Sequence, residues 1–428
     1  MVFDLWPSAF DSIVCEPRVS KGAKAQRPKT LSQNLKDQRP PFVTDPHLRL
    51  ECQPKNMLIG IDGIPLAFPK TGVGHYTYEL ARGLSQLTPA NQFEILYPSS
   101  FAPIKDFEEA SNLKTNRVPV GPVGRHWWST GLPRYVSREG FALFHGTNYD
   151  VPLWRRCPTV VTVHDLSQLL FPETHEKRSV KRARLRLPLM ARTADAVIVP
   201  TEAVRSELQK SLGLVKEKVF VVPEAARQIF KPVQFGVPTG TARERFGIGD
   251  NFILTVGTLE PRKNIETLVS AFEIVAKEND AQLVIAGGRG WLSGPLFSQI
   301  AKSPVRHRIV LTEYLEDEDL RELYCSCRVF VYPSLYEGFG LPPLEAMACG
   351  AAVIASRIPT LVETTGDAAI LVEPKNIAEL AEAILGLLSD TEAAEDLAKA
   401  GLERASQFSW YLTALKTMAV YEHVLGIN

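Results

Sequence analysis

The chain contains 428 residues, and its 48 lysine and arginine residues balance its 48 aspartate and glutamate residues. Hydrophobic residues make up 45% and charged residues 22%, a globular composition that excludes a wholly disordered or fibrous protein. The length favours two or three domains. No uncharged apolar run approaches the roughly 18 residues that span a bilayer, and zero net charge gives the protein no overall attraction to nucleic acid.

The six cysteines are too sparse for a secreted disulfide scaffold, so we expect a reducing, cytoplasmic compartment. Cys325 and Cys327 lie two residues apart, but no second cysteine or histidine pair has the spacing of zinc ligands. Ordinary buried or surface thiols are therefore expected.

Residues 1–56 differ from the rest of the chain. Between Arg18 and Arg39 there are seven lysine or arginine residues and one acidic residue, without sustained periodicity. This pattern predicts a disordered basic tail. It differs from a signal peptide because no apolar stretch follows a basic start, and translation from Met57 is the alternative.

From Met57 onward, short runs rich in Val and Ile alternate with amphipathic segments. Such runs, without polar alternation, are typical of strands buried on both faces of a parallel sheet. The predicted strands are residues 57–62, 93–97, 141–144, 159–163, 196–199, 219–222, 252–256, 282–286, 308–311, 329–332, 351–354 and 369–372. Their alternation with helices such as 76–87, 265–277 and 378–388 predicts an α/β protein with doubly wound sheets.

These strands are too many for one such sheet, so we expect two Rossmann-like domains that face each other across a cleft. Prolines and glycines in residues 230–240 mark the boundary, which gives domains at 57–235 and 236–408. Residues 409–428 are predicted to form a helix that packs back on the N-terminal domain. Ligands of such sheets bind at the carboxyl ends of the strands, so the site is expected in the loops that follow them.

The loop after strand 329–332 carries Glu337, Gly338 and Gly340, and two prolines then open a helix that contains Glu345 in its first turn. The glycines allow the backbone to approach a ligand, and the helix N-terminus offers free N–H groups to an anion. The two carboxylates suit the hydroxyls of a sugar and of a ribose. An ordinary strand–helix turn is the alternative.

The loop after strand 252–256 carries Arg262 and Lys263 before a helix that Asn264 can cap. Two adjacent cations at the mouth of a cleft suit a diphosphate, and an arginine can bind it through two parallel hydrogen bonds. Two solvated surface charges are the alternative.

Two further loops are less specific. Gly72 and Gly74 follow the first strand, but Thr77 stands where a dinucleotide-binding fingerprint needs its third glycine, which leaves open a contact of backbone amides with phosphate or sugar. His164 follows a strand and can bond a substrate hydroxyl, with Asp165 orienting it. A purely structural histidine is an equal alternative.

One acidic segment matches D-x-D, a pattern that can hold a divalent metal. It comprises Asp317, Glu318 and Asp319. Because it starts a predicted helix at 317–325, where the helix dipole favours acids, we predict no metal.

Residues 175–192 carry seven lysine or arginine residues interleaved with leucines, and Pro188 is predicted to interrupt the helix. A solvated charged face is the commoner explanation of such a segment. Peripheral contact with anionic lipid is the other.

Taken together, these motifs resemble a known family. EGFGLPPLEAMACGAAVIAS at 337–356 and VGTLEPRKN at 256–264 resemble the retaining nucleotide-sugar glycosyltransferases of family 4, which have the GT-B fold. IGIDGIPLAFPKTGVGHYTYEL, FHGTNY and VVTVHDLSQLLFPE are similar to the mannosyltransferase-B-like bacterial branch. The resemblance runs from about residue 57 to the end of the chain. It implies that the N-terminal domain binds the acceptor and the C-terminal domain binds the nucleotide-sugar.

The resemblance implies a catalytic set of Glu337, His164, Arg262 and Lys263. The two cations would hold the donor diphosphate, Glu337 would hold the donor sugar, and His164 would contact the transferred sugar. The implied substrate-binding residues are Gly72, Gly74, Gly338, Phe339, Gly340, Leu341 and Glu345, of which Glu345 would bind the ribose hydroxyls.

The implied function is retaining transfer of a hexose, most plausibly mannose from GDP-mannose, to a glycan or lipid-linked oligosaccharide. No cofactor or metal is expected, and no nucleic acid. The expected location is the cytoplasm or the inner face of the cytoplasmic membrane. The alternatives are a hexosyltransferase that uses a UDP- or ADP-sugar, a related epimerase or phosphorylase, and a non-catalytic sugar-binding protein of the same fold.

Overall fold

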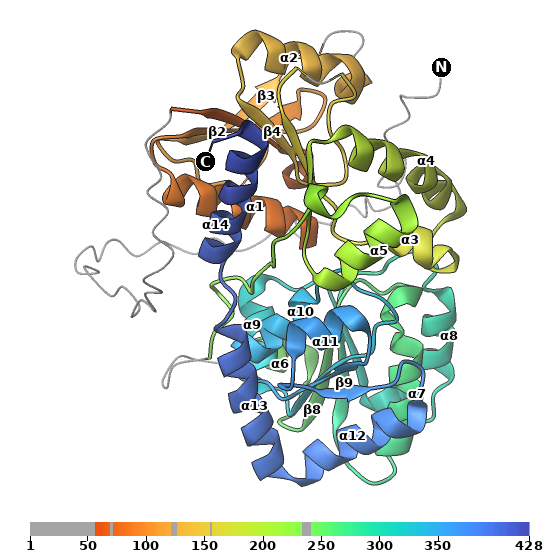
Figure 1. Ribbon diagram of the computed structural model, residues 1–428. Coiled ribbons are helices and arrows are strands. Elements are labelled where there is room, and N and C mark those ends of the chain that lie inside the picture. The colour runs from red at the N-terminus through yellow and green to blue at the C-terminus, as the bar shows by residue number, and fades with distance from the viewer. Residues whose placement is uncertain are drawn as a thin grey trace, which may run out of the picture.

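The computed structural model describes residues 56–68, 72–105, 107–120, 126–154, 156–232 and 241–427. They form two lobes, one above the other in Figure 1, and each lobe is built around one parallel sheet. Apart from Asn56, the predicted tail lies outside the described residues. The predicted boundary between residues 235 and 236 also lies outside them.

The upper lobe contains a seven-stranded sheet with the order β3-β2-β1-β4-β5-β6-β7. All its pairings are parallel. The strands are β1 (Leu58–Asp62), β2 (Gln92–Pro98), β3 (Leu113–Val118), β4 (Leu143–Gly146), β5 (Thr159–Thr162), β6 (Ala196–Val199) and β7 (Val219–Val221). The order runs outward in opposite directions from β1 and β4, so their carboxyl ends form the switch point at which such sheets bind ligands.

The lower lobe repeats this plan with a six-stranded parallel sheet in the order β10-β9-β8-β11-β12-β13. The strands are β8 (Phe252–Val256), β9 (Gln282–Ala286), β10 (Ile309–Glu313), β11 (Val329–Tyr332), β12 (Val353–Ser356) and β13 (Ile370–Val372). Its switch point lies between β8 and β11. The two expected doubly wound sheets are confirmed.

Helices connect the strands of both sheets. In the upper lobe they are α1 (Gly72–Leu87), α2 (Leu132–Glu139), α3 (Ser167–Leu170), α4 (Lys177–Thr193) and α5 (Glu202–Leu212). The later helices are α6 (Thr241–Phe246), α7 (Ile265–Val275), α8 (Gly294–Lys302), α9 (Asp317–Ser326), α10 (Leu341–Ala348), α11 (Pro359–Thr365), α12 (Ile377–Ser389), α13 (Thr391–Ala405) and α14 (Trp410–Leu425).

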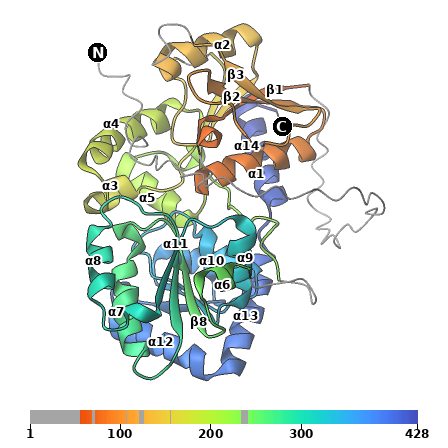
Figure 2. The same ribbon diagram turned by 180° about the vertical axis from the view of Figure 1, so that it is seen from behind.

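The last helix returns to the first lobe, as predicted. In both views α14 lies beside α1 in the upper lobe, although it follows α13 of the lower lobe (Figures 1 and 2). The two helices approach closely because Gly83 of α1 has no side chain: a Cβ there would lie 3.0 Å from the Cβ of Ala414. Trp410, Met418 and Tyr421 of α14 are buried in the same apolar cluster as α1.

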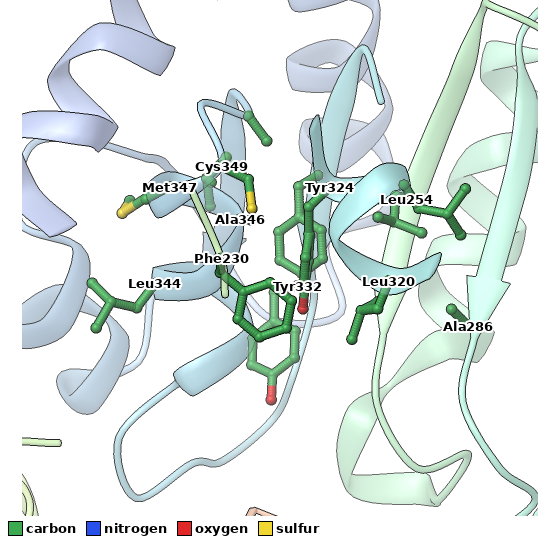
Figure 3. Packing of buried hydrophobic residues seen from close by; sticks show 14 of the residues in the cluster. Phe230, Leu254, Ala286, Leu320, Tyr324, Tyr332, Leu344, Ala346, Met347 and Cys349 are labelled. Carbon is green, nitrogen blue, oxygen red and sulfur yellow. The ribbon is translucent and has the colours of Figure 1, made fainter. Parts of the chain in front are cut away.

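The core of the lower lobe fixes the helix that carries Glu345. Leu344, Ala346 and Met347 of α10 pack in one cluster with Tyr324 of α9 and Tyr332 of β11 (Figure 3). Residues on both sides of Glu345 are buried in this cluster, so the backbone that carries the Glu345 side chain is held in place.

Two sequence-based expectations were wrong. Strand β3 was missed because it is an edge strand whose sequence LKTNRV is mostly polar, with only Leu113 and Val118 buried. Helix α4 runs through Pro188 without interruption. A proline inside a helix removes one backbone hydrogen bond, and burial of Leu187 and Met190 on the inner face of α4 offsets that loss.

Candidate active site

The loops after β8 and β11 are joined along their backbones. The N–H of Leu335 donates to the carbonyl of Arg262 at 2.8 Å, and the side-chain amide of Asn264 donates to the carbonyl of Pro333 at 2.9 Å. Asn264 precedes α7 but makes no side-chain capping bond to it, so the predicted cap was wrong. Its amide ties the two loops together instead.

This junction places both predicted cations on Glu337. Arg262 Nη1 lies 2.9 Å from Glu337 Oε2, and Lys263 Nζ lies 2.7 Å from Glu337 Oε1. Arg262 Nη2 also binds Glu260 Oε1 at 2.6 Å, and Lys263 Nζ donates to the hydroxyl of Tyr332 at 2.6 Å. We call Glu260, Arg262, Lys263, Tyr332 and Glu337 the Glu337 cluster.

The Glu337 cluster is electrostatically balanced. Burial alone would raise the pKa of Glu337, but Arg262 and Lys263 outweigh it and lower the pKa to about 2, so this carboxylate is ionised at physiological pH. Glu260 was not recognised in the sequence, although it stands two residues before Arg262. Because two carboxylates face the two cations, any attraction that the cations exert on a diphosphate is partly offset within the protein.

Three threonine side chains orient the backbone of the loop that precedes α10. Three threonine hydroxyls bind consecutive carbonyls: Thr360 binds that of Glu337 at 2.8 Å, Thr201 that of Gly338 at 3.1 Å, and Thr364 that of Phe339 at 2.6 Å. Among the described residues, no protein acceptor is found for the N–H groups of residues 338–341. These groups lie at the start of α10, where a helix attracts an anion.

The two glycines of this loop have different structural causes. A Cβ on Gly338 would lie 1.9 Å from the carbonyl oxygen of His164, so the absence of a side chain there lets the lobes touch. Close approach to a ligand, the expected reason, is not needed to explain this glycine. Gly340 has a φ of +99°, and a Cβ there would also lie 2.6 Å from Leu361.

His164 is held by the protein on both ring nitrogens. Nδ1 lies 3.0 Å from Glu224 Oε1, and Nε2 lies 2.8 Å from the carbonyl oxygen of Thr147. Burial opposes protonation of the ring, but these two acceptors outweigh it and raise the pKa of His164. Asp165 accepts hydrogen bonds from the N–H and hydroxyl of Ser167 instead, so the expected role of Asp165 in orienting His164 was wrong.

Glu345 lies on the second turn of α10, not on the first turn as predicted. Its Oε1 accepts from Arg227 Nε at 3.1 Å, and its Oε2 accepts from the hydroxyl of Tyr324 at 3.4 Å. Burial raises the pKa of Glu345 to about 7, although Arg227 opposes the shift. The pKa of Glu345 is therefore raised by its surroundings, whereas the pKa of Glu337 is lowered.

Arg227 was missed entirely by sequence reasoning. It follows β7 and reaches out of the upper lobe to Glu345, to Asp317 Oδ1 at 2.6 Å, and to the ring of His75 at 3.3 Å. We call Arg227, Asp317, Tyr324 and Glu345 the Glu345 cluster. No motif marks Arg227, since its partners lie on three other elements.

Gly72 and Gly74 lie within the first turn of α1, not in a loop. Gly74 is buried, while a Cβ on Gly72 would meet no atom within 4 Å. Because His75 beside them touches Arg227, the start of α1 lies next to the Glu345 cluster.

The D-x-D carboxylates are paired with arginines. Asp317 binds Arg227, and Asp319 Oδ2 lies 2.6 Å from Arg245 Nη2. Both acids lie in the first turn of α9, so the predicted helix start at Asp317 is confirmed.

Contacts between the lobes surround this site. The hydroxyl of Tyr336 accepts from the N–H of Leu166 at 3.0 Å and donates to Glu207 at 2.6 Å. Glu363 of α11 accepts from the N–H groups of Glu202 and Ala203 at the start of α5. The structure is therefore that of two lobes in contact.

Two family models match the chain, one in each lobe. "Glycosyltransferase Family 4" matches residues 70–225, and "Glycosyl transferases group 1" matches residues 240–404. The chain belongs to glycosyltransferase family 4. It is a glycosyltransferase, and the expectation drawn from its motifs is confirmed.

Relatives of this family 4 enzyme include the O-antigen chain mannosyltransferase B of Escherichia coli. That protein is 29% identical over 84% of this chain and 97% of its own length. The serotype-specific mannosyltransferase WbdA of Escherichia coli is 29% identical over 66% of this chain, a match that spans 36% of that longer protein.

Among solved structures, sucrose-phosphate synthase from Thermosynechococcus elongatus superposes with a TM-score of 0.73. It is 22% identical and covers 87% of this chain and 100% of its own. The likeness confirms the GT-B fold with its C-terminal helix. In the described part of this family 4 enzyme, no helix is long and apolar enough to cross a bilayer.

Proposed function

We propose that this family 4 glycosyltransferase transfers a hexose with retention from a nucleotide-sugar, with mannose from GDP-mannose as the first candidate, to a glycan or lipid-linked oligosaccharide. The mannosyltransferase relatives support the choice of sugar. One observation carries the proposal. The N–H groups of residues 338–341, which have no acceptor within the described part of the chain, stand beside the ion-paired Arg262, Lys263 and Glu337.

The chemistry follows from where charge develops. Breaking the anomeric C–O bond makes the sugar positive and the departing diphosphate negative. The free N–H groups and the α10 dipole stabilise the diphosphate, together with Arg262 and Lys263. Glu337 would meet the hydroxyls of the sugar, since an ionised carboxylate only accepts hydrogen bonds. A phosphate oxygen takes the proton of the acceptor, so no enzymic base is required.

We propose His164 as a contact for the transferred sugar through its ring or backbone. Its two nitrogens already have protein partners, so the hydrogen bond to a hydroxyl would require one of these to be exchanged. Gly72 and Gly74 are proposed to approach the donor through the N–H groups at the start of α1.

We propose that transfer does not require a metal ion. The pairing of Asp317 with Arg227 and of Asp319 with Arg245 supports this, because carboxylates engaged by guanidinium groups are poor metal ligands. Transfer should persist in excess EDTA. Loss of transfer in EDTA and its recovery with Mn²⁺ would overturn the proposal.

A thermal-shift panel of GDP-, UDP- and ADP-sugars tests the donor. The proposal expects the largest shift with GDP-mannose, and a larger shift with a UDP- or ADP-sugar would favour the alternative hexosyltransferase. Release of nucleotide from the best donor then separates an enzyme from a non-catalytic binder. Glu337→Ala should abolish that release, while Glu373→Ala, which removes an exposed partner of Arg357, should not.

We further propose that α4 contacts anionic lipid, where a lipid-linked acceptor would be found. Its outer face carries only cations and leucines, and Leu185 is 63% exposed. Trp154, which is 67% exposed, lies on the loop that Arg186 of α4 joins through Asp150 at 2.6 Å. Exposed apolar groups beside cations favour the surface of an anionic bilayer.

Flotation with phosphatidylglycerol vesicles tests this contact. We expect the native chain to float with anionic vesicles and not with phosphatidylcholine vesicles. Lys181→Glu with Arg184→Glu should abolish flotation, whereas Lys375→Glu with Lys399→Glu, an equal charge change on the lower lobe, should not. Equal flotation of both variants would reject α4 as the contact.

A further inference from the structure

Arg227 is a buried cation with no role in the chemistry described above. Its side chain is only 9% exposed, and its guanidinium lies over the ring of Phe230 with Cζ 4.5 Å from the ring centroid. Phe230 in turn packs edge-on against Tyr324 (Figure 3). The hydroxyl of Tyr324 also contacts Glu345. The guanidinium therefore has one fixed position.

Arg227 bonds two carboxylates and also lies 3.3 Å from the ring of His75. Nε faces Glu345 Oε1 at 3.1 Å, and Nη1 faces Asp317 Oδ1 at 2.6 Å. Asp317 thus anchors one side of the guanidinium, so that the other side presents Nε to Glu345. A guanidinium that is bonded to Asp317 as well holds the Glu345 carboxylate in place more firmly than one bonded to Glu345 alone.

The remaining acceptor capacity of Glu345 is what a ribose would use. An ionised carboxylate has about four acceptor sites on its two oxygens, and Arg227 and Tyr324 take one site on each oxygen. One site per oxygen is left, which matches the two neighbouring hydroxyls of a ribose. A protonated carboxyl would instead offer one donor and fewer acceptors.

We infer that Arg227 is a positioning residue for the ribose of the donor: it favours the ionised form of the Glu345 carboxylate and orients that carboxylate to accept from the two ribose hydroxyls. This inference rests on the proposed function and on the ribose-binding role that the family resemblance implies for Glu345. Arg227 acts through Glu345 and needs no contact with the nucleotide. Removing it leaves a buried carboxylate without its cation, which favours the protonated form.

The test compares a nucleoside diphosphate with its 2′,3′-dideoxy form by isothermal titration. GDP, UDP and ADP are first screened on the native chain, and the tightest binder is used. We expect the native chain to prefer the ribose form by about 10–100-fold, as two hydrogen bonds to a charged acceptor allow. Arg227→Gln should reduce this preference to about threefold or less, with little change for the dideoxy form.

Three variants make the result specific. Glu345→Gln should lose the same preference, and Arg227→Gln combined with Glu345→Gln should lose nothing further, since both act on one contact. Arg245→Gln is the matched control, because Arg245 pairs with Asp319 on the same helix as Asp317 yet is about half exposed. It should keep the native preference.

If Arg227→Gln does not fold, Arg227→Lys is used for the test, because lysine keeps the positive charge on a shorter side chain. Its preference should fall between that of the native chain and that of Glu345→Gln. A native preference with weaker binding of both nucleotides, in either variant, would show that Arg227 only joins the lobes and would overturn the inference. If no nucleoside diphosphate binds the native chain, the proposed function falls as well.

Discussion

Glu337, in the loop before α10, and Glu345, on the second turn of α10, are both buried, yet their pKa values are shifted in opposite directions. Glu337 faces two cations, and its pKa is lowered to about 2, whereas Glu345 faces one cation that it shares with Asp317, and its pKa is raised to about 7. Burial opposes ionisation in both places. The number of cations that face each carboxylate decides which effect prevails.

This difference suits the two clusters to the two roles proposed for them. The Glu337 cluster has a fixed charge pattern and is suited to a reaction centre, where groups should not reorganise during the chemical step. The Glu345 cluster lies close to a protonation change at neutral pH, so its affinity for a hydroxyl-bearing ligand can vary with pH.

Removing the Glu337 carboxylate should have the largest effect. Glu337→Gln leaves Arg262 and Lys263 buried with one acidic partner, Glu260, between them. We expect a loss of about 3–5 kcal/mol in unfolding free energy, as for other broken buried pairs. Transfer should fall about 100–1,000-fold, as when one stabilising group of a reaction centre is removed.

Urea unfolding and initial rates measure these two losses. Glu373→Gln is the control, because Glu373 forms an ion pair with Arg357 in which both side chains are more than half exposed. It should cost less than about 1 kcal/mol. Similar losses in the two variants would mean that Glu337 is not held as a buried, ionised group.

A methyl group at Gly338 should have the next largest effect. Gly338→Ala places a Cβ where the carbonyl of His164 stands, 1.9 Å away, so the lobes must separate. We expect kcat to fall about 10–100-fold, since small displacements of reacting groups are costly. Because Arg227 reaches Glu345 from the upper lobe, this separation should also weaken their ion pair.

Small-angle scattering should show a larger radius of gyration for Gly338→Ala. Gly386→Ala is the matched control, because Gly386 lies inside α12 and a Cβ there meets no atom within 4 Å. It should stabilise the helix by about 1 kcal/mol and leave kcat unchanged. An active Gly338→Ala enzyme with native dimensions would contradict the steric argument.

The sequence predicts the Glu337 cluster better than the Glu345 cluster for a physical reason. Arg262, Lys263 and Glu337 stand in loops that directly follow adjacent buried strands, and parallel strands bring such loops together at one edge. Arg227 lies in a segment without a motif, and it meets Asp317 and Glu345 only through the packing of two lobes.

Errors in the N-terminal lobe have a related cause. Strand β3 has polar residues on a sheet edge, where the apolar signal of a buried strand is missing. Glu224, which binds His164, is 60 residues away from it in the chain. The neighbouring Asp165 instead accepts a hydrogen bond from Ser167 in its own loop. Sequence proximity therefore suggested the wrong carboxylate.

The pH dependence of nucleotide binding should show a moderate effect. The proposed contact with the ribose hydroxyls needs the ionised form of Glu345, whose pKa is about 7, so affinity should rise about tenfold between pH 6 and pH 8. Charged or titratable groups that face it are Arg227, Asp317, Tyr324 and Cys349. Glu345→Gln should give a flat profile over this range, and an equally steep profile in that variant would exclude Glu345 as the cause.

The two carboxylates should also affect stability in opposite directions. The folded pKa of Glu345 lies above its ordinary value of 4.5, so the unfolding free energy falls as pH rises from about 4.5 to 7. The folded pKa of Glu337 lies below 4.5, so its contribution is present above about 4.5 and is lost as pH falls toward 2. Urea unfolding of Glu345→Gln should lack the first slope and retain the second.

The smallest effects are expected from a matched pair of tyrosine variants. Tyr332→Phe removes the acceptor at 2.6 Å from Lys263 Nζ in the Glu337 cluster, and Tyr324→Phe removes the donor at 3.4 Å from Glu345 Oε2. The first leaves a buried ammonium short of an acceptor and should cost about 1–3 kcal/mol, while the second removes a long bond and should cost less than about 1 kcal/mol. Tyr324→Phe should nevertheless move the midpoint of the pH profile upward, because the lost donor favoured the ionised carboxylate, whereas Tyr332→Phe should leave that midpoint in place. Thermal unfolding measures the two stability costs, and titration calorimetry measures the midpoint of the pH profile. A larger stability cost for Tyr324→Phe than for Tyr332→Phe would mean that hydrogen-bond length does not predict the strength of the contacts in these clusters.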